Sequence, residues 1–443
     1  MMKDLTLFFL EVTATYFFFI ACLYAVLLAL SWIKIRRYSG KTTASDLPGV
    51  SFLIPAYNEE SLIVETIQTY LSLGHEKKEI IVINDGSSDQ TMKLLSTMYF
   101  LRKVSDNMFA SITHPALRIV NVPHLGKAQA LNRGLFHARF PLVCTMDADT
   151  IPSREGVEAC LSAFARDKKL IACGGVIQVM NSQTLKNNLP VENHKGSWLV
   201  TFQRIEYLRT FVCERLGWSL LDSTILISGA FCMVKKEAVE RVGGFNHRSI
   251  TEDFDLIVRL RKEYSDEDHS MRILPVTTCY TQVPGKVRHL MRQRVRWQLG
   301  LMQTLFANKS LFLNPRHGIL GVIAIPYMWI VELLSPVFEL TAYVIVPVAW
   351  FTGQMSTEAF LGWLIAGLLY NFVLTLLGLA LDTKYISQTR AMSWRKIALG
   401  SLFIHFGYKQ MTMWWRLRAL FKTVGRNHGW GEKPREEIVV LNS

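Results

Sequence analysis

Apolar and polar positions divide the chain into long apolar runs near its two ends and a mixed region between them. The first run extends from Leu5 to Trp32 and contains a single charged residue, Glu11. It is longer than the roughly 20 residues that a helix needs to cross a bilayer. Basic residues favour the cytosolic side of a membrane, and the run is followed by Lys34, Arg36 and Arg37. The pattern predicts an amino-terminal membrane anchor over residues 1–37, followed by a polar linker.

Residues 48–300 have the pattern of an α/β domain, in which short apolar runs alternate with amphipathic segments. We expect strands at about residues 50–55, 79–83, 118–122 and 170–179, and a further strand from Leu142 to Asp149. Strands that alternate with helices predict a largely parallel sheet. Ligands of such sheets bind beyond the carboxyl ends of the strands. Polar segments follow the four strands that come first along the chain, at about residues 50–55, 79–83, 118–122 and 142–149. The sequence therefore predicts one binding crevice at that edge.

Two carboxylates, Asp147 and Asp149, stand at the end of one of these strands. Alternate residues of a strand project to the same face, so both side chains can point into the crevice. Such a pair suits a hard divalent cation such as Mg²⁺ or Mn²⁺, which is usually shared with the phosphates of a substrate. The pair alone fits a solvated acidic turn equally well. The polar segments at the other strand ends favour the cation.

Apolar runs return after Arg316. The run over about 319–351 contains Pro336 and is too long for one crossing and too short for two. We expect an interfacial helix up to Leu334 that joins a spanning helix at Pro336. A second run, about 360–381, predicts another span, whereas the weaker run at 397–415 fits an interfacial or re-entrant helix. The pattern predicts a membrane region over 301–417 and a basic tail over 418–443, which the positive-inside tendency places in the cytosol.

Composition narrows the choice of partner. The net charge is +13, apolar residues make up 50% of the chain and charged residues only 19%. This balance fits a soluble domain joined to membrane segments that meets a membrane surface or a phosphorylated substrate. Nucleic acid is not expected as a partner, because the sequence has no basic helix, zinc-finger spacing or aromatic RNA-binding motif. The seven cysteines include no C-x-x-C pair, so we expect reduced cysteines rather than a disulfide framework.

Seven short motifs occur in order along the chain: PAYNEE (55–60), VINDGSSD (82–89), GKAQALN (126–132), DAD (147–149), SGAF (228–231), TEDFD (251–255) and QRVRW (293–297). Together they resemble the membrane-embedded inverting family-2 glycosyltransferases, which include the cellulose, chitin, hyaluronan and poly-N-acetylglucosamine synthases. The resemblance implies a cytosolic GT-A-type (Rossmann-like) domain in an integral protein of the plasma (inner) membrane. It also implies a UDP-sugar donor, Mg²⁺ or Mn²⁺, and a growing polysaccharide or a lipid as acceptor.

The resemblance assigns roles position by position. Asp253 would be the catalytic base, and Asp149 with Asp147 would hold the metal. The donor site would contain Pro55, Ala56, Asn58, Glu59, Asp85, Lys127, Asp147, Arg294 and Arg296. The acceptor end would lie at Gly229, Gln293 and Trp297. Taken alone, Asp253 is an ordinary first-turn helix acid, Trp297 a membrane-interface residue and Lys127 a solvated side chain. Their shared order in the motifs favours the functional roles.

These residue types fit the implied reaction. Negative charge develops on the diphosphate as the sugar leaves, and a divalent cation with Arg and Lys side chains stabilises it. The attacking hydroxyl must lose a proton, which a carboxylate can accept. Direct displacement of an α-linked UDP then gives a β-glycoside.

Alternatives remain open at this stage. We expect processive synthesis of a β-linked polysaccharide, with N-acetylglucosamine as the favoured sugar. The same motifs fit a non-processive enzyme that adds one sugar to ceramide or a diacylglycerol, and a transporter or receptor with a non-catalytic domain is a third reading. Residues Trp430 to Arg435 resemble the tail of hyaluronan-synthase relatives that covers the nucleotide, and a basic tail without such a role is the alternative. The sequence identifies no partner subunit.

Overall fold

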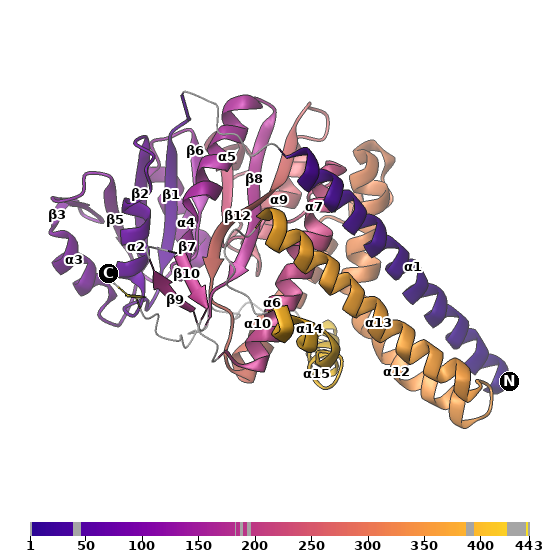
Figure 1. Cartoon of the computed structure of the whole chain (residues 1–443). Helices are drawn as coiled ribbons and strands as arrows, with labels where there is room; N and C mark the ends of the chain where they lie inside the picture. Colours follow the sequence, from indigo (N-terminus) through magenta and orange to yellow (C-terminus); the bar gives the residue numbers. More distant parts are fainter. Residues whose placement is uncertain are drawn as a thin grey trace.

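The computed structural model describes residues 2–38, 46–181, 183–186, 189–192, 196–386, 394–422 and 440–441. Most of the expected linker after the anchor and the Trp430–Arg435 segment lie outside the described residues. Figure 1 shows an α/β domain on one side, from which the long helices α1, α12 and α13 extend together toward the N-terminus. The expected combination of an α/β domain with apolar helices is confirmed.

A ten-stranded sheet forms the centre of the domain, in the order β3-β4-β5-β2-β1-β6-β11-β8-β12-β7. Its strands are β1 (Val50–Ala56), β2 (Lys78–Asp85), β3 (Leu101–Ser105), β4 (Met108–Ser111), β5 (Leu117–Val122), β6 (Leu142–Thr145), β7 (Thr150–Pro152), β8 (Leu170–Val179), β11 (Cys232–Lys235) and β12 (Ser270–Thr281). A separate sheet joins β9 (Gln183–Lys186), β10 (Leu189–Glu192) and β13 (Val440–Leu441).

The prediction of a largely parallel sheet needs correction. Strands β5, β2, β1 and β6 are parallel as expected, but β11 pairs antiparallel with both β6 and β8 in the middle of the sheet. The β3–β4 hairpin and β7 add antiparallel pairs toward the edges. The sheet is therefore mixed, because long-range pairing decides strand direction and local apolar patterning does not.

Helices cover the sheet and carry several of the motifs. They are α2 (Ile63–Leu71), α3 (Thr91–Tyr99), α4 (Lys127–His137), α5 (Arg154–Arg166), α8 (Lys236–Arg241) and α9 (Glu252–Glu263). Thr251 occupies the N-cap position of α9, but its side chain makes no capping hydrogen bond. It packs instead against Gly300, where an added Cβ would collide with the Thr251 side chain. Because it has no side chain, Gly300 thus permits close contact between α9 and α10 (Val287–Ala307).

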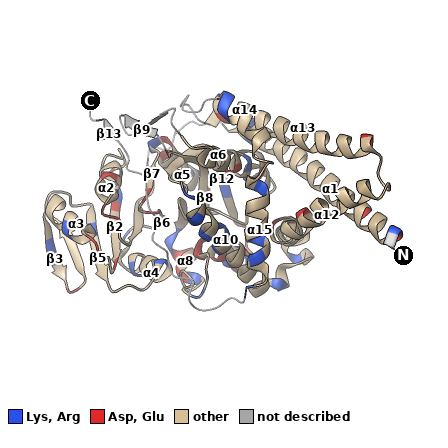
Figure 2. Ribbon diagram, turned by 90° about the horizontal axis from the view of Figure 1, so that it is seen from below, with Lys and Arg blue, Asp and Glu red and all other residues tan. Residues whose placement is uncertain are grey.

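Two long helices are apolar enough to cross a membrane. The first is α1 (Met2–Arg37), whose candidate span is Lys3–Arg37. The second is α13 (Thr357–Leu381), which continues into η6 (Asp382–Ile386) and gives a candidate span of Thr357–Ile386. A third candidate span is a pair bent by 49°, Leu320–Leu333 with α12 (Ser335–Phe351). The bend lies where the sequence predicts a junction, next to Pro336. Figure 2 shows that these helices are mostly uncharged, whereas Lys, Arg, Asp and Glu gather on the domain.

The weaker apolar run forms two shorter helices, α14 (Trp394–Phe403) and α15 (Tyr408–Leu420), which do not pass as spans among the described residues. Gly407, with a φ of 90°, separates them. The remaining short elements are η2 (Lys309–Leu311), η3 (Pro315–His317), η4 (Leu320–Ala324), α11 (Ile325–Tyr327) and η5 (Met328–Leu333).

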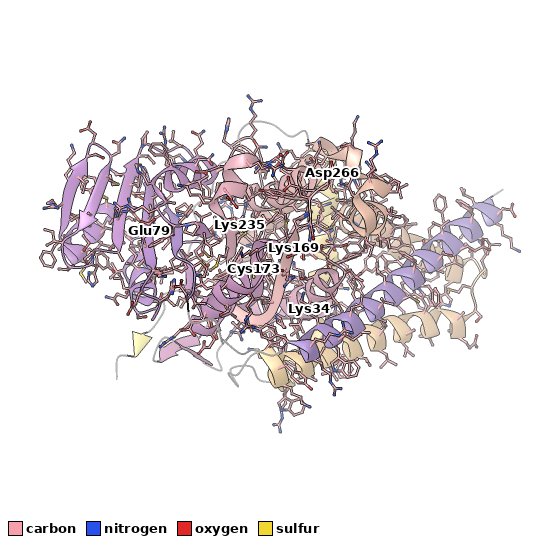
Figure 3. All side chains as sticks on the ribbon, turned by 90° about the horizontal axis from the view of Figure 1, so that it is seen from above. Lys34, Glu79, Lys169, Cys173, Lys235 and Asp266 are labelled. Atoms are coloured by element: carbon pink, nitrogen blue, oxygen red, sulfur yellow. The ribbon has the colours of Figure 1, made fainter. Side chains whose placement is uncertain are left out.

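Helix α1 is packed directly on the domain. It lies against a continuous helical segment made of α6 (Trp198–Leu208), the π-helical η1 (Arg209–Arg215) and α7 (Leu216–Leu220). A Cβ added at Gly217 of α7 would lie 2.5 Å from the Leu27 carbonyl oxygen of α1. Lys34 Nζ donates to Ser219 Oγ (2.7 Å), which also accepts the Ile273 N–H of β12 (2.8 Å). Figure 3 shows Lys34 at this junction.

Candidate active site

The loops after β1 and β2 are tied together at the carboxyl edge of the sheet. Asn58 has a φ of 54°, and its N–H donates to Ser87 Oγ at 3.0 Å. Its side-chain oxygen accepts the Ser88 N–H at 2.8 Å. The Glu59 N–H donates to Thr91 Oγ1 at 2.8 Å. The two motifs, far apart in sequence, therefore form one wall of the crevice.

Asp85 holds the next loop in place. Its carboxylate is fully buried and accepts the N–H groups of Leu125 (2.7 Å) and Gly126 (2.9 Å). His124 Nδ1 lies 3.0 Å from the same carboxylate, and the His124 ring stacks on Tyr57 at 4.2 Å. Because this loop leads into α4, Asp85 fixes the start of the helix that carries Lys127. The expected contact of Asp85 with the donor stays a prediction.

Lys127 joins the two halves of the crevice. Its Nζ lies 2.7 Å from Asp147 Oδ1 and 2.8 Å from Glu252 Oε1, and its side chain is only 12% exposed. Burial acts to lower the pKa of Lys127, but the carboxylates of Asp147, Glu252 and Asp253 outweigh it and raise the pKa. Lys127 is therefore a permanent positive charge between the acidic pair and the start of α9.

The acidic pair lies in a turn rather than at the end of an extended strand. Strand β6 stops at Thr145, and the Thr150 N–H donates to the Asp147 carbonyl at 3.1 Å. The turn leads directly into β7, which pairs with the end of β12. The expectation of alternate strand positions was wrong, although both carboxylates do lie at this edge.

Both carboxylates lie near the buried Cys279 thiol. Burial raises the pKa of the Cys279 thiol, and both Asp147 and Asp149 raise it further, which places both near one buried group. The Asp149 side chain is buried, whereas that of Asp147 is 21% exposed. Among the described residues, no group of three or more His, Cys, Asp or Glu side chains could hold an ion. Two carboxylates still fit an ion that takes its other ligands from donor phosphates and water.

Asp253 is held in a defined orientation at the start of α9. Its Oδ2 accepts the Gly229 N–H at 2.8 Å, and its Oδ1 accepts the Phe254 N–H at 2.9 Å. A Cβ at Gly229 would lie 3.1 Å from Asp253 Cβ and Oδ2, so the backbone passes directly beside the carboxylate. Glycine permits this close approach.

The QRVRW motif lies on α10. Arg294 Nη2 is 2.5 Å from Glu206 Oε2, and the Arg294 guanidinium stacks on the Trp297 ring at 4.7 Å. Burial acts to lower the pKa of Arg294, but Glu206, Tyr408 and Tyr207 together outweigh it and raise the pKa. Gln293, Arg296 and Trp297 are partly exposed on the same helix.

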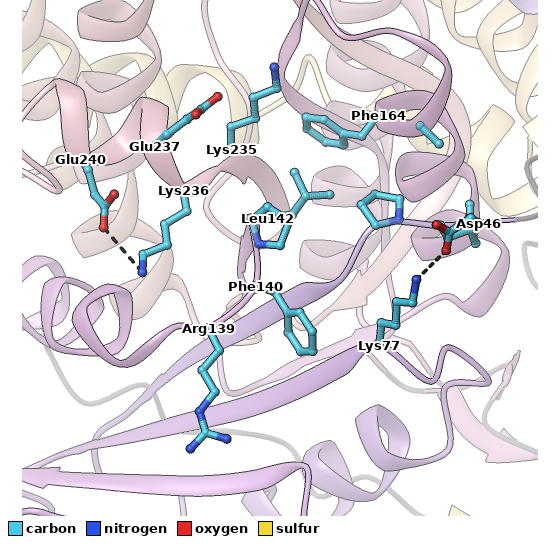
Figure 4. Close-up of a pocket in the computed structure, with 14 residues that line it drawn as sticks. Asp46, Lys77, Arg139, Phe140, Leu142, Phe164, Lys235, Lys236, Glu237 and Glu240 are labelled. Carbon is cyan, nitrogen blue, oxygen red and sulfur yellow. Dashed lines mark hydrogen bonds and ion pairs between the residues drawn. The ribbon is translucent and has the colours of Figure 1, made fainter.

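A cavity of about 680 Å³ lies at the opposite edge of the sheet, where β1, β2 and β6 begin. Two of its cations are already paired, Lys77 with Asp46 (2.5 Å) and Lys236 with Glu240 (3.6 Å), as Figure 4 shows. The cavity brings together none of the motif residues. The candidate active site is therefore at the carboxyl edge, where the motif residues meet.

Comparison with known proteins shows the family of the chain. The sequence model of Glycosyl transferase family 2 matches residues 51–243. The poly-β-1,6-N-acetyl-D-glucosamine synthase of Staphylococcus aureus (strain COL) is 30% identical over 331 residues, which are 71% of this chain and 73% of the relative. The chain belongs to glycosyl transferase family 2. The synthase of the same name from Staphylococcus epidermidis is 33% identical over 260 residues, 59% of this chain and 56% of that relative.

A solved structure supports the fold of this family-2 glycosyltransferase. The mannosyltransferase PcManGT from Pyrobaculum calidifontis, in complex with GDP-Man and Mn²⁺, superimposes with a TM-score of 0.56. It is 19% identical and the match covers 95% of this chain and 99% of that one. This likeness confirms the GT-A-like fold.

Three side chains that adjoin the candidate site residues were not predicted from the sequence. Glu252 is the second residue of TEDFD, and its charge next to Asp253 could have drawn attention to it. Glu206 and Tyr408, which meet at Arg294, lie in helical segments without a motif. Only the folded arrangement brings them to the QRVRW helix.

Proposed function

We propose that this protein is an inverting, metal-dependent synthase that transfers a sugar, favoured as N-acetylglucosamine, from UDP to a growing β-linked polysaccharide. The convergence of Lys127, the acidic pair and Asp253 at one edge carries this proposal. The two named staphylococcal relatives support the choice of polymer.

The chain's own residues divide the reaction between them. The acceptor hydroxyl oxygen forms a bond to the anomeric carbon, while the bond from that carbon to the UDP oxygen breaks and its electron pair leaves with UDP. The hydroxyl proton passes to the Asp253 carboxylate, which the N–H groups of Gly229 and Phe254 aim at the crevice. Lys127 provides positive charge near the leaving diphosphate.

Asp147 and Asp149 would hold the divalent ion, Mg²⁺ or Mn²⁺. When bound, such an ion neutralises charge on the leaving diphosphate. The Asp147 side chain is 21% exposed and lies beside Lys127, so it can be reached by an ion that a donor diphosphate shares. Support for Mn²⁺ comes from the structural neighbour, whose complex contains GDP-Man and Mn²⁺.

We further propose that the protein is integral to the plasma membrane, with the catalytic domain in the cytosol. The proposed parts are an anchor (1–37), a GT-A domain (48–300), a membrane and interfacial region (301–417) and a cytosolic tail (418–443). Basic residues at the end of α1, Lys34, Arg36 and Arg37, support this orientation.

UDP release by the detergent-purified protein tests the proposal, with Mg²⁺ or Mn²⁺ and a panel of UDP-sugars beside GDP-mannose. We expect release with one UDP-sugar and a long product. Asp253→Asn should lower the rate by about 10²–10⁴-fold, as for loss of a general base, whereas Asp266→Asn on the surface should not. A product with one sugar on a lipid would favour the non-processive alternative. Absence of release with every donor, with lipid supplied, would refute the proposal.

A further inference from the structure

A three-residue cluster connects the QRVRW helix to two other elements. Glu206 Oε2, from α6, lies 2.5 Å from Arg294 Nη2 of α10. The Tyr408 hydroxyl, at the start of α15, donates to the same oxygen at 2.8 Å. The Arg294 side chain is 14% exposed and that of Glu206 28%. One carboxylate oxygen therefore joins α6, α10 and α15.

The cluster compensates the charge of Arg294. A guanidinium in contact with a carboxylate contributes little net positive charge to a third group. Arg296, in the same motif, forms no ion pair with any residue that the structure describes. Of the two arginines, Arg296 is thus the one suited to meet the diphosphate.

The same contacts fix the orientation of Trp297. The Arg294 guanidinium stacks on the Trp297 ring at 4.7 Å, a cation–π contact. Glu206 accepts from the guanidinium and from the Tyr408 hydroxyl, and Tyr408 itself packs on Phe202 at 5.1 Å. The line of contacts runs from Glu206 and Tyr408 through Arg294 to the indole.

The backbone positions both supporting residues. Tyr408 is the first residue of α15, directly after Gly407, whose N–H donates to Gln410 Oε1 at 2.8 Å. Glu206 lies near the end of α6, just before the π-helical η1. Interruptions of regular helix of this kind are frequent at functional sites.

We propose that Glu206 and Tyr408 are positioning residues that hold Arg294 and, through it, Trp297 at the acceptor end of the crevice. Arg294 then acts on the acceptor side instead of on the diphosphate. This inference rests on the proposed function and revises the donor-binding role that the motif alone implies for Arg294.

Steady-state kinetics of the full-length protein separate the two roles of Arg294. The variants are Glu206→Gln, Tyr408→Phe and Arg294→Lys, with Glu237→Gln and Tyr385→Phe as surface controls. The probes are the UDP-sugar accepted by the wild type and an N-acetylglucosamine oligosaccharide as acceptor. We expect KM for the oligosaccharide to rise by about tenfold, the size of one lost cation–π contact. Products should shorten, while KM for the donor stays within about twofold.

Four outcomes are distinguishable. A rise in donor KM with unchanged acceptor KM would place Arg294 on the diphosphate and overturn the inference. Unchanged acceptor KM and product length in Tyr408→Phe, the mildest change, would overturn it even if Glu206→Gln fails to fold. Absence of UDP release by the wild type would instead refute the proposed function. Partial recovery of acceptor KM in Glu206→Asp, which keeps the carboxylate, would support positioning.

Discussion

Replacement of Lys127 by methionine removes the ammonium group that lies between Asp147 and Glu252, while keeping most of the side-chain volume. Both carboxylates are within 2.8 Å of it, and their side chains are 21% and 9% exposed. Loss of one partner from a buried ion pair costs about 3–5 kcal/mol, because the other charge stays buried. Since Asp147 keeps some contact with solvent, we expect about 3 kcal/mol.

That loss of free energy of unfolding can be measured in detergent. For a domain of this size it corresponds to a fall in melting temperature of roughly 6–12 °C. Transfer should fall by about 10²–10³-fold, as for loss of one group that stabilises a developing negative charge. Lys93→Met, on the exposed face of α3, is the matched control and should change neither quantity.

A second substitution distinguishes charge from packing. Lys127→Met with Glu252→Gln removes one of the uncompensated carboxylates, so it should recover part of the lost stability without recovering transfer. The reasoning is refuted if Lys127→Met melts with the Lys93→Met control and keeps wild-type transfer. It is also refuted if the double variant is as unstable as the sum of the two single changes.

Two further predictions concern Gly229 and Glu214. Gly229→Ala places a Cβ 3.1 Å from Asp253 Oδ2 and should shift the carboxylate. We therefore expect kcat to fall by about tenfold or more with little change in melting temperature. An unchanged kcat would contradict this. Burial raises the pKa of Glu214 to about 8 from 4.5, so the folded state binds more protons and stability should decline as pH rises from 4.5 to 8. Glu214→Gln should flatten this decline in melting curves across the same range, and an identical slope in both proteins would argue against it.

Local patterning predicts those parts of the fold that depend on neighbouring residues. Strands β1, β2, β5 and β8 follow from apolar runs that end in polar loops, and the structure places them within a few residues of their expected bounds. The bend at Pro336 follows from a run of the wrong length for whole crossings. These features are encoded over short distances along the chain.

Features that depend on distant partners could not be predicted. Strand β11 reverses the sheet because it pairs with β6 and β8, and nothing within its four residues fixes a direction. Glu206 meets partners 88 and 202 positions away in sequence, so its local context is that of an ordinary helix residue. The turn at Asp147 depends on the pairing of β7 with β12, which lies far along the chain.

The contacts between α1 and the domain have a mechanical consequence. A domain joined to its membrane anchor by a flexible linker would change its orientation relative to the bilayer. Here the backbone of Leu27 touches Gly217, and Lys34 reaches the sheet through Ser219. With α1 inserted in a bilayer, these contacts keep the candidate active site at a fixed distance from the lipid and in a fixed orientation. Under the proposed function, the acceptor would have to move to a stationary site, and any advance of the product would come from motion of the sugar chain itself.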